Sequence, residues 1–301
     1  SWWQPSGLVS QPRRVAITFD DVPLTGSPHA RCDADVLERL TNRLVGQIEA
    51  LGIPATGLVV ESRMCKALRP TVLPRLLRVW IEAGLDLGNH TFSHPDLNDT
   101  PPEAYKADIV KGEATVRSVL EASGMELRYF RYPMLHAGAS VRTKVAIETF
   151  LVERGYTIAP VTIDNQEWVF AAVYSRARQR RDSATARRIS EAYLSHMDEA
   201  FHFYERLSLD LLGYELPQVL LLHANELNAD LLGELAGLLE GRGYRFISLD
   251  EALEDPAYRR PDEYVGRRGL SWLQRWAVAE DLDIPPEPRE PAWVAELFRT
   301  Y

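Results

Sequence analysis

The chain has 301 residues, of which 46% are hydrophobic and 26% are charged. A globular chain of this size can form one domain that buries about 75% of the surface of its unfolded form. The formal net charge of −9 argues against a nucleic-acid partner, because binding to phosphates depends on an excess of lysine and arginine. No run of about 18 or more apolar residues occurs, so we expect no membrane span.

The first residues, Ser-Trp-Trp at 1–3, contain no methionine. We therefore expect a processed N-terminus from which any signal peptide has been removed, and a periplasmic or secreted protein, with the cytoplasm as the alternative. The two cysteines, Cys32 and Cys65, each lie a little beyond a predicted strand. They could form a disulfide in an exported protein, but two free thiols fit the sequence equally well.

Segments with the pattern of strands alternate along the chain with segments that have the pattern of helices. This alternation is typical of a parallel sheet, and seven strands with intervening helices predict an α/β fold, a distorted and closed or nearly closed β/α barrel. An open doubly wound sheet is the alternative. Strands are expected at 15–19, 55–61, 85–89, 127–132, 157–163, 218–223 and 244–248, and helices at about 33–51, 72–83, 102–122, 140–154 and 228–240.

Two stretches interrupt this alternation. Residues 169–216 are long for a connection, and their Arg-rich Ala/Glu/Leu pattern predicts two added helices, an insertion of the kind that often shapes a binding groove. Residues 255–301 contain six prolines, which forbid one long helix, so we expect an extension packed on a catalytic barrel formed by residues 1–254. Trp272 and Trp276 should be buried there, and an exposed pair that stacks on sugars is the alternative.

Chemically active side chains follow two of the predicted strands. The sequence Thr-Phe-Asp-Asp at 18–21 ends the first strand, and His90 and His94 follow the third. Each motif alone fits a simpler interpretation, either a solvated turn or two partly buried histidines. Both motifs lie where strands of α/β barrels end and active sites collect, so we interpret them together as one functional site.

One aspartate and two histidines are three ligands for a metal ion. If the chain around His90 forms a single turn, histidines at a spacing of four face the same way, and Pro95 disfavours a longer helix. Three protein ligands leave the fourth tetrahedral position open for water, which is the pattern of a catalytic rather than a structural zinc site. The remaining aspartate would remove a proton from that water. The two motifs therefore predict a metal-assisted hydrolase.

Five motifs together resemble, in order and in type, the signatures of the polysaccharide deacetylases, the NodB-homology proteins of carbohydrate esterase family 4. The resemblance extends over about 15 to 250, most of the chain, and it implies a barrel of the NodB type. The motifs are Thr-Phe-Asp-Asp at 18–21, His-Thr-Phe-Ser-His at 90–94, Arg-Tyr-Pro-Met at 131–134, Asp-Asn-Gln-Glu-Trp at 164–168 and Leu-Leu-Leu-His at 220–223.

The resemblance implies a role for each central residue. Asp20 would be the general base, and Asp21, His90 and His94 would hold the metal. His223 would be the general acid that protonates the leaving amine, a role suited to a side chain that titrates near neutral pH. The expected cofactor is one divalent ion, with zinc as the first choice and cobalt or nickel as alternatives that suit the same ligands.

The resemblance also implies supporting roles. Arg131 would pair with Asp20 and keep it ionised and directed at the water. Glu167 would pair with His223 and favour its protonated form. The backbone N–H of Met134 would stabilise the tetrahedral oxyanion together with the metal.

Several features depart from the family pattern or leave its details open. Met134 stands where an aromatic residue is usual, so the floor of the groove should differ although the backbone donor is kept. Glu167 replaces the usual aspartate, which moves the carboxylate by about one bond length. Trp168 is expected either to form a wall of the pocket or to lie in the core. The insertion and the C-terminal extension lie outside the common core, so they leave the substrate more open than the chemistry.

The resemblance thus implies a hydrolase that removes N-acetyl groups from an amino-sugar polymer or oligomer and releases acetate. The alternatives are an O-acetyl esterase or small-amide hydrolase on the same fold, or an inactive carbohydrate-binding protein. The expected partner is an N-acetylated glycan, and no obligate protein partner is evident. The sequence leaves the identity of the glycan, the native metal and the oligomeric state open.

Overall fold

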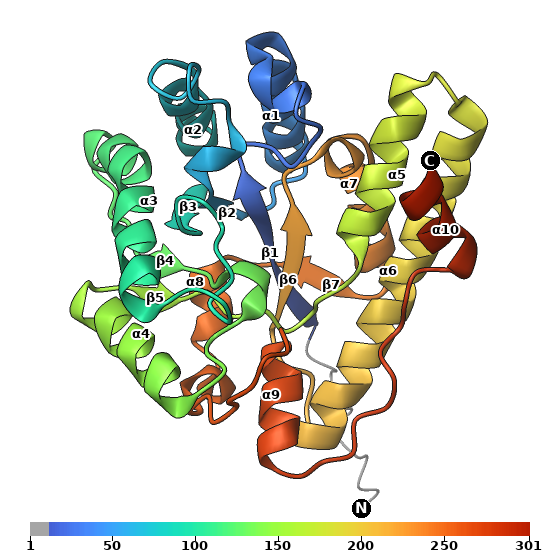
Figure 1. The fold of residues 1–301 in the computed structure, drawn as a ribbon. Helices are drawn as coiled ribbons and strands as arrows, with labels where there is room; N and C mark the ends of the chain where they lie inside the picture. The colour runs from blue at the N-terminus through green and yellow to red at the C-terminus, as the bar shows by residue number, and fades with distance from the viewer. Residues whose placement is uncertain (1–11) are drawn as a thin grey trace, which may run out of the picture.

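The computed structural model describes residues 12–301, so the expectation for the N-terminus at 1–3 lies outside the described residues. Seven parallel strands form one sheet in the order β5-β4-β3-β2-β1-β6, and β7 pairs with the start of β1 (Figure 1). The strands are β1 (Arg13–Val22), β2 (Thr56–Val59), β3 (Asp86–Asn89), β4 (Tyr129–Phe130), β5 (Thr157–Ile158), β6 (Gln218–His223) and β7 (Tyr244–Phe246).

The sheet curls until its two edges nearly meet. β5 and β6 lie at the ends of the strand order, and a single bridge joins Ile163, which follows β5, to Leu220 on β6. At this seam Thr162 N donates to Val219 O at 3.0 Å, and Leu221 N donates to Ile163 O at 3.1 Å. The predicted distorted barrel of seven parallel strands is therefore confirmed, and the alternative of an open doubly wound sheet is wrong.

The predicted strand at 157–163 is longer than the strand that forms. β5 ends at Ile158, and Pro160 cannot donate a backbone hydrogen bond to a neighbouring strand. The carbonyls of Ala159 and Pro160 accept hydrogen bonds from Arg131 Nε and Nη2 at 3.1 and 3.2 Å. The backbone after β5 thus binds a buried arginine instead of continuing the ladder.

Helices cover the outer side of the strands (Figure 1). Helix α1 begins where the Asp33 carboxylate accepts hydrogen bonds from the N–H groups of Asp35 and Val36, and its apolar side chains pack into the core. The helices are α1 (Ala34–Ala50), α2 (Val72–Glu82), α3 (Pro102–Ala122), α4 (Val141–Glu153), α5 (Glu167–Gln179), α6 (Ser183–Leu212), α7 (Glu226–Gly241), α8 (Leu249–Leu253), α9 (Trp272–Ala279) and α10 (Ala292–Thr300), with short 3-10 helices η1 (Ala30–Cys32), η2 (Glu61–Arg63), η3 (Pro133–Leu135) and η4 (Pro256–Arg259).

The two helices that the sequence predicts within residues 169–216 are α5 and α6, and they pack against each other. The segment 255–301 contains the short helices α9 and α10, which contact α6 and α5 respectively (Figure 1). Trp272 and Trp276 are 7% and 3% exposed, so the alternative of an exposed sugar-stacking pair is wrong. A domain boundary at residue 254 stays a prediction.

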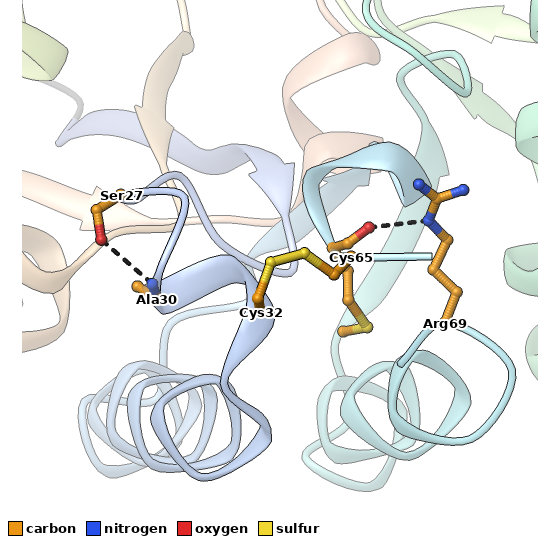
Figure 2. The surroundings of a disulfide bond; sticks show 6 residues. Ser27, Ala30, Cys32, Cys65 and Arg69 are labelled. Atoms are coloured by element: carbon orange, nitrogen blue, oxygen red, sulfur yellow. Dashed lines mark hydrogen bonds between the residues drawn. A yellow bond between two sulfur atoms is a disulfide. The ribbon is translucent and has the colours of Figure 1, made fainter. Parts of the chain in front are cut away.

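Cys32 and Cys65 form a disulfide, with their Cα atoms 5.0 Å apart (Figure 2). The bond joins η1, in the connection that follows β1, to the segment that follows η2. Next to it, Cys65 N donates to Arg31 O at 3.1 Å, and Arg69 Nε donates to Met64 O at 2.8 Å. Two loops that begin at neighbouring strands are therefore fastened together close to the end of the sheet.

None of the helices in residues 12–301 combines the length and the apolar composition that crossing a membrane requires.

Candidate active site

The candidate catalytic residues lie at the carboxyl ends of adjacent strands. Asp20 on β1 is paired in register with His223 on β6. His90 follows directly after β3, and Arg131 follows directly after β4. Because carboxyl ends of parallel strands lie on one side of a barrel, Asp20, His90 and His223 line one pocket, and Arg131 lies beneath it and binds Asp20.

Asp21, His90 and His94 form a cluster that could hold a metal ion, with one potential ligand atom from each residue within 4.8 Å of the others. Asp21 Oδ1 lies 4.0 Å from His90 Nε2 and 3.7 Å from His94 Nε2. His90 Nδ1 lies 2.8 Å from Arg131 O, a contact that requires the proton on Nδ1 and leaves Nε2 with a lone pair. The Nε2 atoms of His90 and His94 thus both lie within 4.0 Å of Asp21 Oδ1, and that of His90 carries a lone pair.

Asp21 uses its two carboxylate oxygens differently. Oδ2 accepts hydrogen bonds from Arg63 Nη2 at 2.8 Å and Thr25 Oγ1 at 3.0 Å. Oδ1 is buried and has no hydrogen-bond partner among the described residues. A buried carboxylate oxygen without a partner is costly, so an oxygen directed at two histidine nitrogens fits a metal ligand.

The charges around this cluster favour the ionisation states of metal ligands. Burial raises the pKa of Asp21, but the attraction of His94, His223 and Arg63 outweighs burial and holds that pKa below its ordinary value. Burial and the neighbouring His90 lower the pKa of His94 to about 4. A carboxylate beside a neutral imidazole is the state in which Asp21 and His94 bind a metal.

Asp20 is held by a fully buried arginine. Arg131 is 0% exposed and donates from Nη1 to Asp20 Oδ1 at 2.6 Å and to Thr18 Oγ1 at 2.7 Å. The other oxygen of Asp20, Oδ2, lies 3.5 Å from His90 Nε2 and so faces the metal-ligand cluster. The hydrogen bond from Arg131 fixes the orientation of the Asp20 carboxyl group, while Oδ2 remains directed at the place where a substrate water would react.

His223 is held by Glu167 from the start of α5. The imidazole Nδ1 lies 2.8 Å from Glu167 Oε2, and the second oxygen of Glu167 accepts hydrogen bonds from the amides of Asn225 and Asn228. Burial lowers the pKa of His223, but the hydrogen bond and charge of Glu167, with the further charges of Asp21 and Asp20, raise it to about 9. The buried carboxylate thus favours an imidazolium whose Nε2 is left to donate.

The pocket above these groups has a volume of about 340 Å³. Met134 and Trp168 both line it, and their side chains are 42% and 43% exposed. The ring of Trp168 packs edge-on against Phe298 of α10, with the ring centroids 5.3 Å apart. Of the two expectations for Trp168, the pocket wall is therefore the one that the structure supports.

The structure brings together all nine residues that the sequence analysis named for the site, and it adds three. Thr25 and Arg63 bind Asp21, and no sequence motif indicates either of them. Asp164 lines the pocket, and burial together with nearby carboxylates raises its pKa to about 7, although the N–H of Asn165 opposes this shift. Asp164 is the first residue of the acidic motif at 164–168, so the sequence did contain a pattern that could have indicated this residue.

A protein-family model described as polysaccharide deacetylase matches residues 9–148. Residues 9–148 belong to the polysaccharide deacetylase family. The match extends from the start of β1 to α4, so it includes the metal-ligand cluster, Asp20 and Arg131, whereas Glu167 and His223 lie beyond it. The resemblance read from the five motifs is thereby confirmed.

Among curated proteins, a chitooligosaccharide deacetylase of Bradyrhizobium sp. (strain ANU 289) is 31% identical to this chain over 112 residues. The match spans 37% of the present chain and 42% of the relative, less than half of that relative's length.

Solved structures show the same fold at low sequence identity. A polysaccharide deacetylase from Bacillus cereus is 17% identical, with a TM-score of 0.52, over 78% of this chain and 91% of the other. A family 4 carbohydrate esterase from Streptomyces lividans, solved in complex with acetate, is 19% identical, with a TM-score of 0.50, over 80% of this chain and 95% of the other. A family 4 pseudoenzyme from Bacillus anthracis is 13% identical, with a TM-score of 0.52, over 80% of this chain and 66% of the other.

Proposed function

We propose that this protein is a metal-dependent hydrolase that removes N-acetyl groups from an amino-sugar polymer or oligomer. One observation carries the proposal: the metal-ligand cluster, Asp20 and His223 line one pocket, and the buried side chains of Arg131 and Glu167 hold Asp20 and His223 from behind. The family of residues 9–148 and the chitooligosaccharide deacetylase relative support the class of substrate.

The residues present fit a divalent metal ion. Asp21 Oδ1 is a buried oxygen without a hydrogen-bond partner among the described residues, and the Nε2 atoms of His90 and His94 face it. Asp21, His90 and His94 would hold the ion, and their mixed oxygen and nitrogen donors suit zinc, with cobalt or nickel as alternatives. A bound ion would supply Lewis-acid chemistry to amide hydrolysis.

Asp20 and His223 would move the protons. Asp20 Oδ2, the oxygen that Arg131 Nη1 leaves free, would accept a proton from the attacking water. His223 would donate its Nε2 proton to the nitrogen of the breaking C–N bond, so that the sugar leaves as a free amine and the acyl group as acetate. Glu167 would stabilise the imidazolium before that transfer.

Met134 and Trp168 would shape the place of the acetyl group. The backbone N–H of Met134 would donate to the oxyanion that forms when water adds to the amide carbonyl. Trp168 offers an exposed aromatic surface beside the acid His223. Apolar walls with a few fixed polar groups are typical of small-ligand sites.

An ester is the second candidate substrate class. An alkoxide leaving group needs less protonation than an amine, so a strong dependence of the rate on His223 favours N-deacetylation over O-deacetylation. The inactive alternative deserves a direct test, because a pseudoenzyme occurs among the structural neighbours. Retention of a complete set of buried charged groups supports an active enzyme, since such groups are costly to bury without function.

The disulfide between Cys32 and Cys65 supports a proposal about location. Disulfides persist in oxidising compartments and are rare in the reducing cytosol. We infer that the protein works in the periplasm or outside the cell.

Acetate release tests the proposed function. The protein is assayed on N-acetylated and O-acetylated sugars as purified, after chelation, and after addition of zinc, cobalt or nickel. The expected result is release from an N-acetylated sugar that chelation abolishes and a divalent ion restores. Glycan binding without acetate release, in protein shown to contain its metal, would overturn the proposal in favour of a binding protein.

A further inference from the structure

The candidate active-site pocket adjoins a second hollow between the loop after β1 and helix α5. Thr25 and Trp168 line both the pocket and this hollow, which has a volume of about 350 Å³. A third hollow of about 330 Å³ lies further toward α1 and shares Ser27 and Ser175 with the second. Shared lining residues thus place the three hollows next to one another, with residues of α5 lining each of them. We call the three hollows together the groove.

The second hollow carries mainly neutral hydrogen-bonding groups and one aromatic surface. Ser27 and Ser175 contribute hydroxyl groups and Gln179 contributes an amide, while the ring of Trp168 stands at the border with the pocket. The amide of Asn225 also lines the hollow, but it is already bound to Glu167 and to the N–H of Asn228. Sugar rings combine hydroxyl groups with apolar faces, so a wall of this kind recognises them through hydrogen bonds and aromatic contact.

The two charged side chains of this hollow have opposite signs and have partners within the protein. Arg176 Nη1 donates to Phe298 O at 2.7 Å, which fastens α5 to α10. Glu226 lies 3.7 Å from Arg178. The second hollow therefore offers no net charge to an anionic polymer, and its chemistry fits a neutral glycan chain. The third hollow adds one further charged side chain, Arg39, at the end of the groove away from the candidate active site.

We propose that this groove binds further sugar units of a neutral N-acetylated glycan, on one side of the unit whose acetyl group is removed. The inference rests on the proposed function and deepens it, because it makes the substrate an oligomer or polymer instead of a single sugar. The wall that α5 forms belongs to the insertion, which lies beyond the family match at 9–148. The groove is thus a feature of this chain rather than of the matched region.

The test compares chain lengths. Metal-loaded wild-type protein is assayed on N-acetylglucosamine oligomers of increasing length, and the expected kcat/KM rises by about tenfold or more between short and long oligomers as more of the groove is filled. Ser175→Trp places a bulky ring in the groove, so it should remove this rise and leave the rate on the shortest accepted oligomer unchanged. Ala172→Trp, on the same wall, repeats the test if Ser175→Trp fails to fold.

Ser118→Trp is the matched control, because Ser118 is exposed on α3 and lines none of these hollows. Equal kcat/KM values at all lengths in the wild type, or an equal loss at all lengths in Ser175→Trp, would overturn the groove. Calorimetric binding of a long oligomer separates this failure from failure of the proposed function. If the wild type releases no acetate but binds the oligomer more tightly than Ser175→Trp does, the proposed groove is supported and the proposed enzymatic function is wrong.

An independent observation concerns the turn formed by Met134 and Leu135. Both residues line the candidate pocket, and both have a φ of 55°, a backbone conformation that side chains with a Cβ rarely adopt. Gly269 lies directly behind the turn, where an added Cβ would come within 2.0 Å of Met134 O. Arg275 of α9 donates from Nη2 to Leu135 O. The C-terminal extension thus supports this turn from the side opposite the substrate.

The guanidinium of Arg275 is held by several partners in addition to the turn. The side chain is 1% exposed, donates from Nε to Leu270 O at 2.9 Å and from Nη1 to Asp262 Oδ2 at 2.8 Å, and stacks over the ring of Trp272 at 4.2 Å. Lys144 Nζ also donates to Asp262 Oδ2 at 2.6 Å. A buried arginine with this many partners has one orientation, so its remaining donor sets the position of the Leu135 carbonyl.

We infer that Arg275 is a positioning residue for the reaction, acting through the Met134–Leu135 turn. Leu135 O shares a peptide plane with the N–H of His136, and this N–H donates to Pro133 O at 3.1 Å. Pro133 O in turn shares a plane with the Met134 N–H, so holding Leu135 O from behind sets, through this hydrogen bond, the direction of the Met134 N–H that the proposed function uses. This inference also rests on the proposed function.

Two variants test whether the extension supports the Met134–Leu135 turn, one at the Arg275 side chain and one at the contact between Gly269 and Met134 O. Arg275→Lys keeps a buried charge but loses the second donor arm, and Gly269→Ala keeps every charge but pushes against Met134 O. Each should lower kcat by about tenfold or more while KM changes little, because an oxyanion donor acts in the transition state. Hydrogen exchange of the peptide 131–138, measured without substrate, should become faster in both.

Arg260→Ala is the control, because Arg260 belongs to the same extension but pairs with Glu280 at the surface. Unchanged exchange at 131–138 in both variants, or unchanged kcat with accelerated exchange, would overturn the positioning role. The exchange result is independent of activity, so it stands whether or not the proposed function does.

Discussion

Asp20 and His223 are register partners on the adjacent parallel strands β1 and β6. Arg131 donates to Asp20 and orients its carboxyl group, and Glu167 binds His223 and favours its protonated form. A carboxyl oxygen that can accept a proton beside an imidazole that can donate one is the arrangement that general acid and base catalysis requires.

Replacing either proton-transfer group should strongly lower kcat and leave the metal bound. Asp20→Asn and His223→Ala remove one transfer each, and general acid or base catalysis contributes about 10²- to 10⁴-fold, so kcat should fall by that factor. Acetate release measures the loss, and metal analysis after dialysis measures occupancy. A His223→Ala variant with a near-normal rate would show that the acid assignment is wrong.

Replacing a predicted metal ligand should lower the metal content of the protein as well as its activity. His90→Ala and His94→Ala each leave two of the three ligands, so metal content after dialysis should fall strongly and activity with it. His202→Ala is the control, because this histidine lies on α6 away from the cluster and should keep the metal. Full metal occupancy in both ligand variants would mean that the ion binds elsewhere.

The metal and acid–base residues were predictable because each lies in a short motif at the end of an apolar strand. Asp20, His90 and His223 follow runs whose strand character is evident, and parallel strands bring their ends together. Arg63 and Thr25 were not predictable, because their roles come from loops that no local pattern places beside Asp21.

The length of β5 and the contacts of the C-terminal extension show a second limit of prediction from the sequence. The apolar run at 157–163 predicts one strand, but the carbonyls of Ala159 and Pro160 bind Arg131, a partner that the run itself does not reveal. Likewise, Gly269 reads as an ordinary loop glycine until the fold places it against Met134 O. Contacts between segments far apart in the chain depend on packing, and periodicity carries no information on them.

The activity of the enzyme should depend on pH through the Glu167–His223 pair. The pKa of His223 is raised to about 9, so kcat/KM of the wild type should fall as the pH rises through about 9 and the acid loses its proton. Glu167→Gln removes the charge that raises this pKa, so the fall should move toward the ordinary value of 6.5. An identical alkaline limb in the variant would contradict the pairing.

The same pair predicts a pH dependence of stability. For a base whose pKa is raised by folding, the added stability is complete below the unfolded pKa of 6.5 and is lost as the pH rises through about 9. The stability difference between wild type and Glu167→Gln in urea should therefore shrink between pH 6 and pH 10. A constant difference across that range would assign the effect of the substitution to packing.

The disulfide should stabilise the loops beside the site. Cys32 and Cys65 are 33 residues apart, and closing a loop of this length stabilises a fold by about 4 kcal/mol in the chain-entropy description. Urea unfolding of the oxidised protein, the reduced protein and the Cys32→Ser/Cys65→Ser double variant measures this. The reduced protein and the double variant should agree with each other. Equal stability of all three forms would show that the bond contributes nothing.

Asp164 should oppose stability at neutral and alkaline pH. Burial is the main cause that raises its pKa to about 7, with the Asn165 N–H opposing and the Glu287 carboxylate adding to the shift. For an acid whose pKa is raised by folding, the favourable contribution is complete below the unfolded value of 3.8 and is lost as the pH rises through about 7. Asp164→Asn stays neutral and keeps an oxygen for the N–H of Asn165, which donates to Asp164 Oδ1 at 2.7 Å.

Chelated Asp164→Asn protein should therefore gain stability relative to chelated wild type as the pH rises from 5 to 8, and the two should be similar at pH 4. Thermal unfolding at each pH measures the gain. Asp283→Asn is the control, because this aspartate is exposed and should give the same small difference at every pH. If Asp164→Asn also gives a pH-independent difference, Asp164 is ionised in the fold at neutral pH, and its charge must then be balanced by His223 across the pocket.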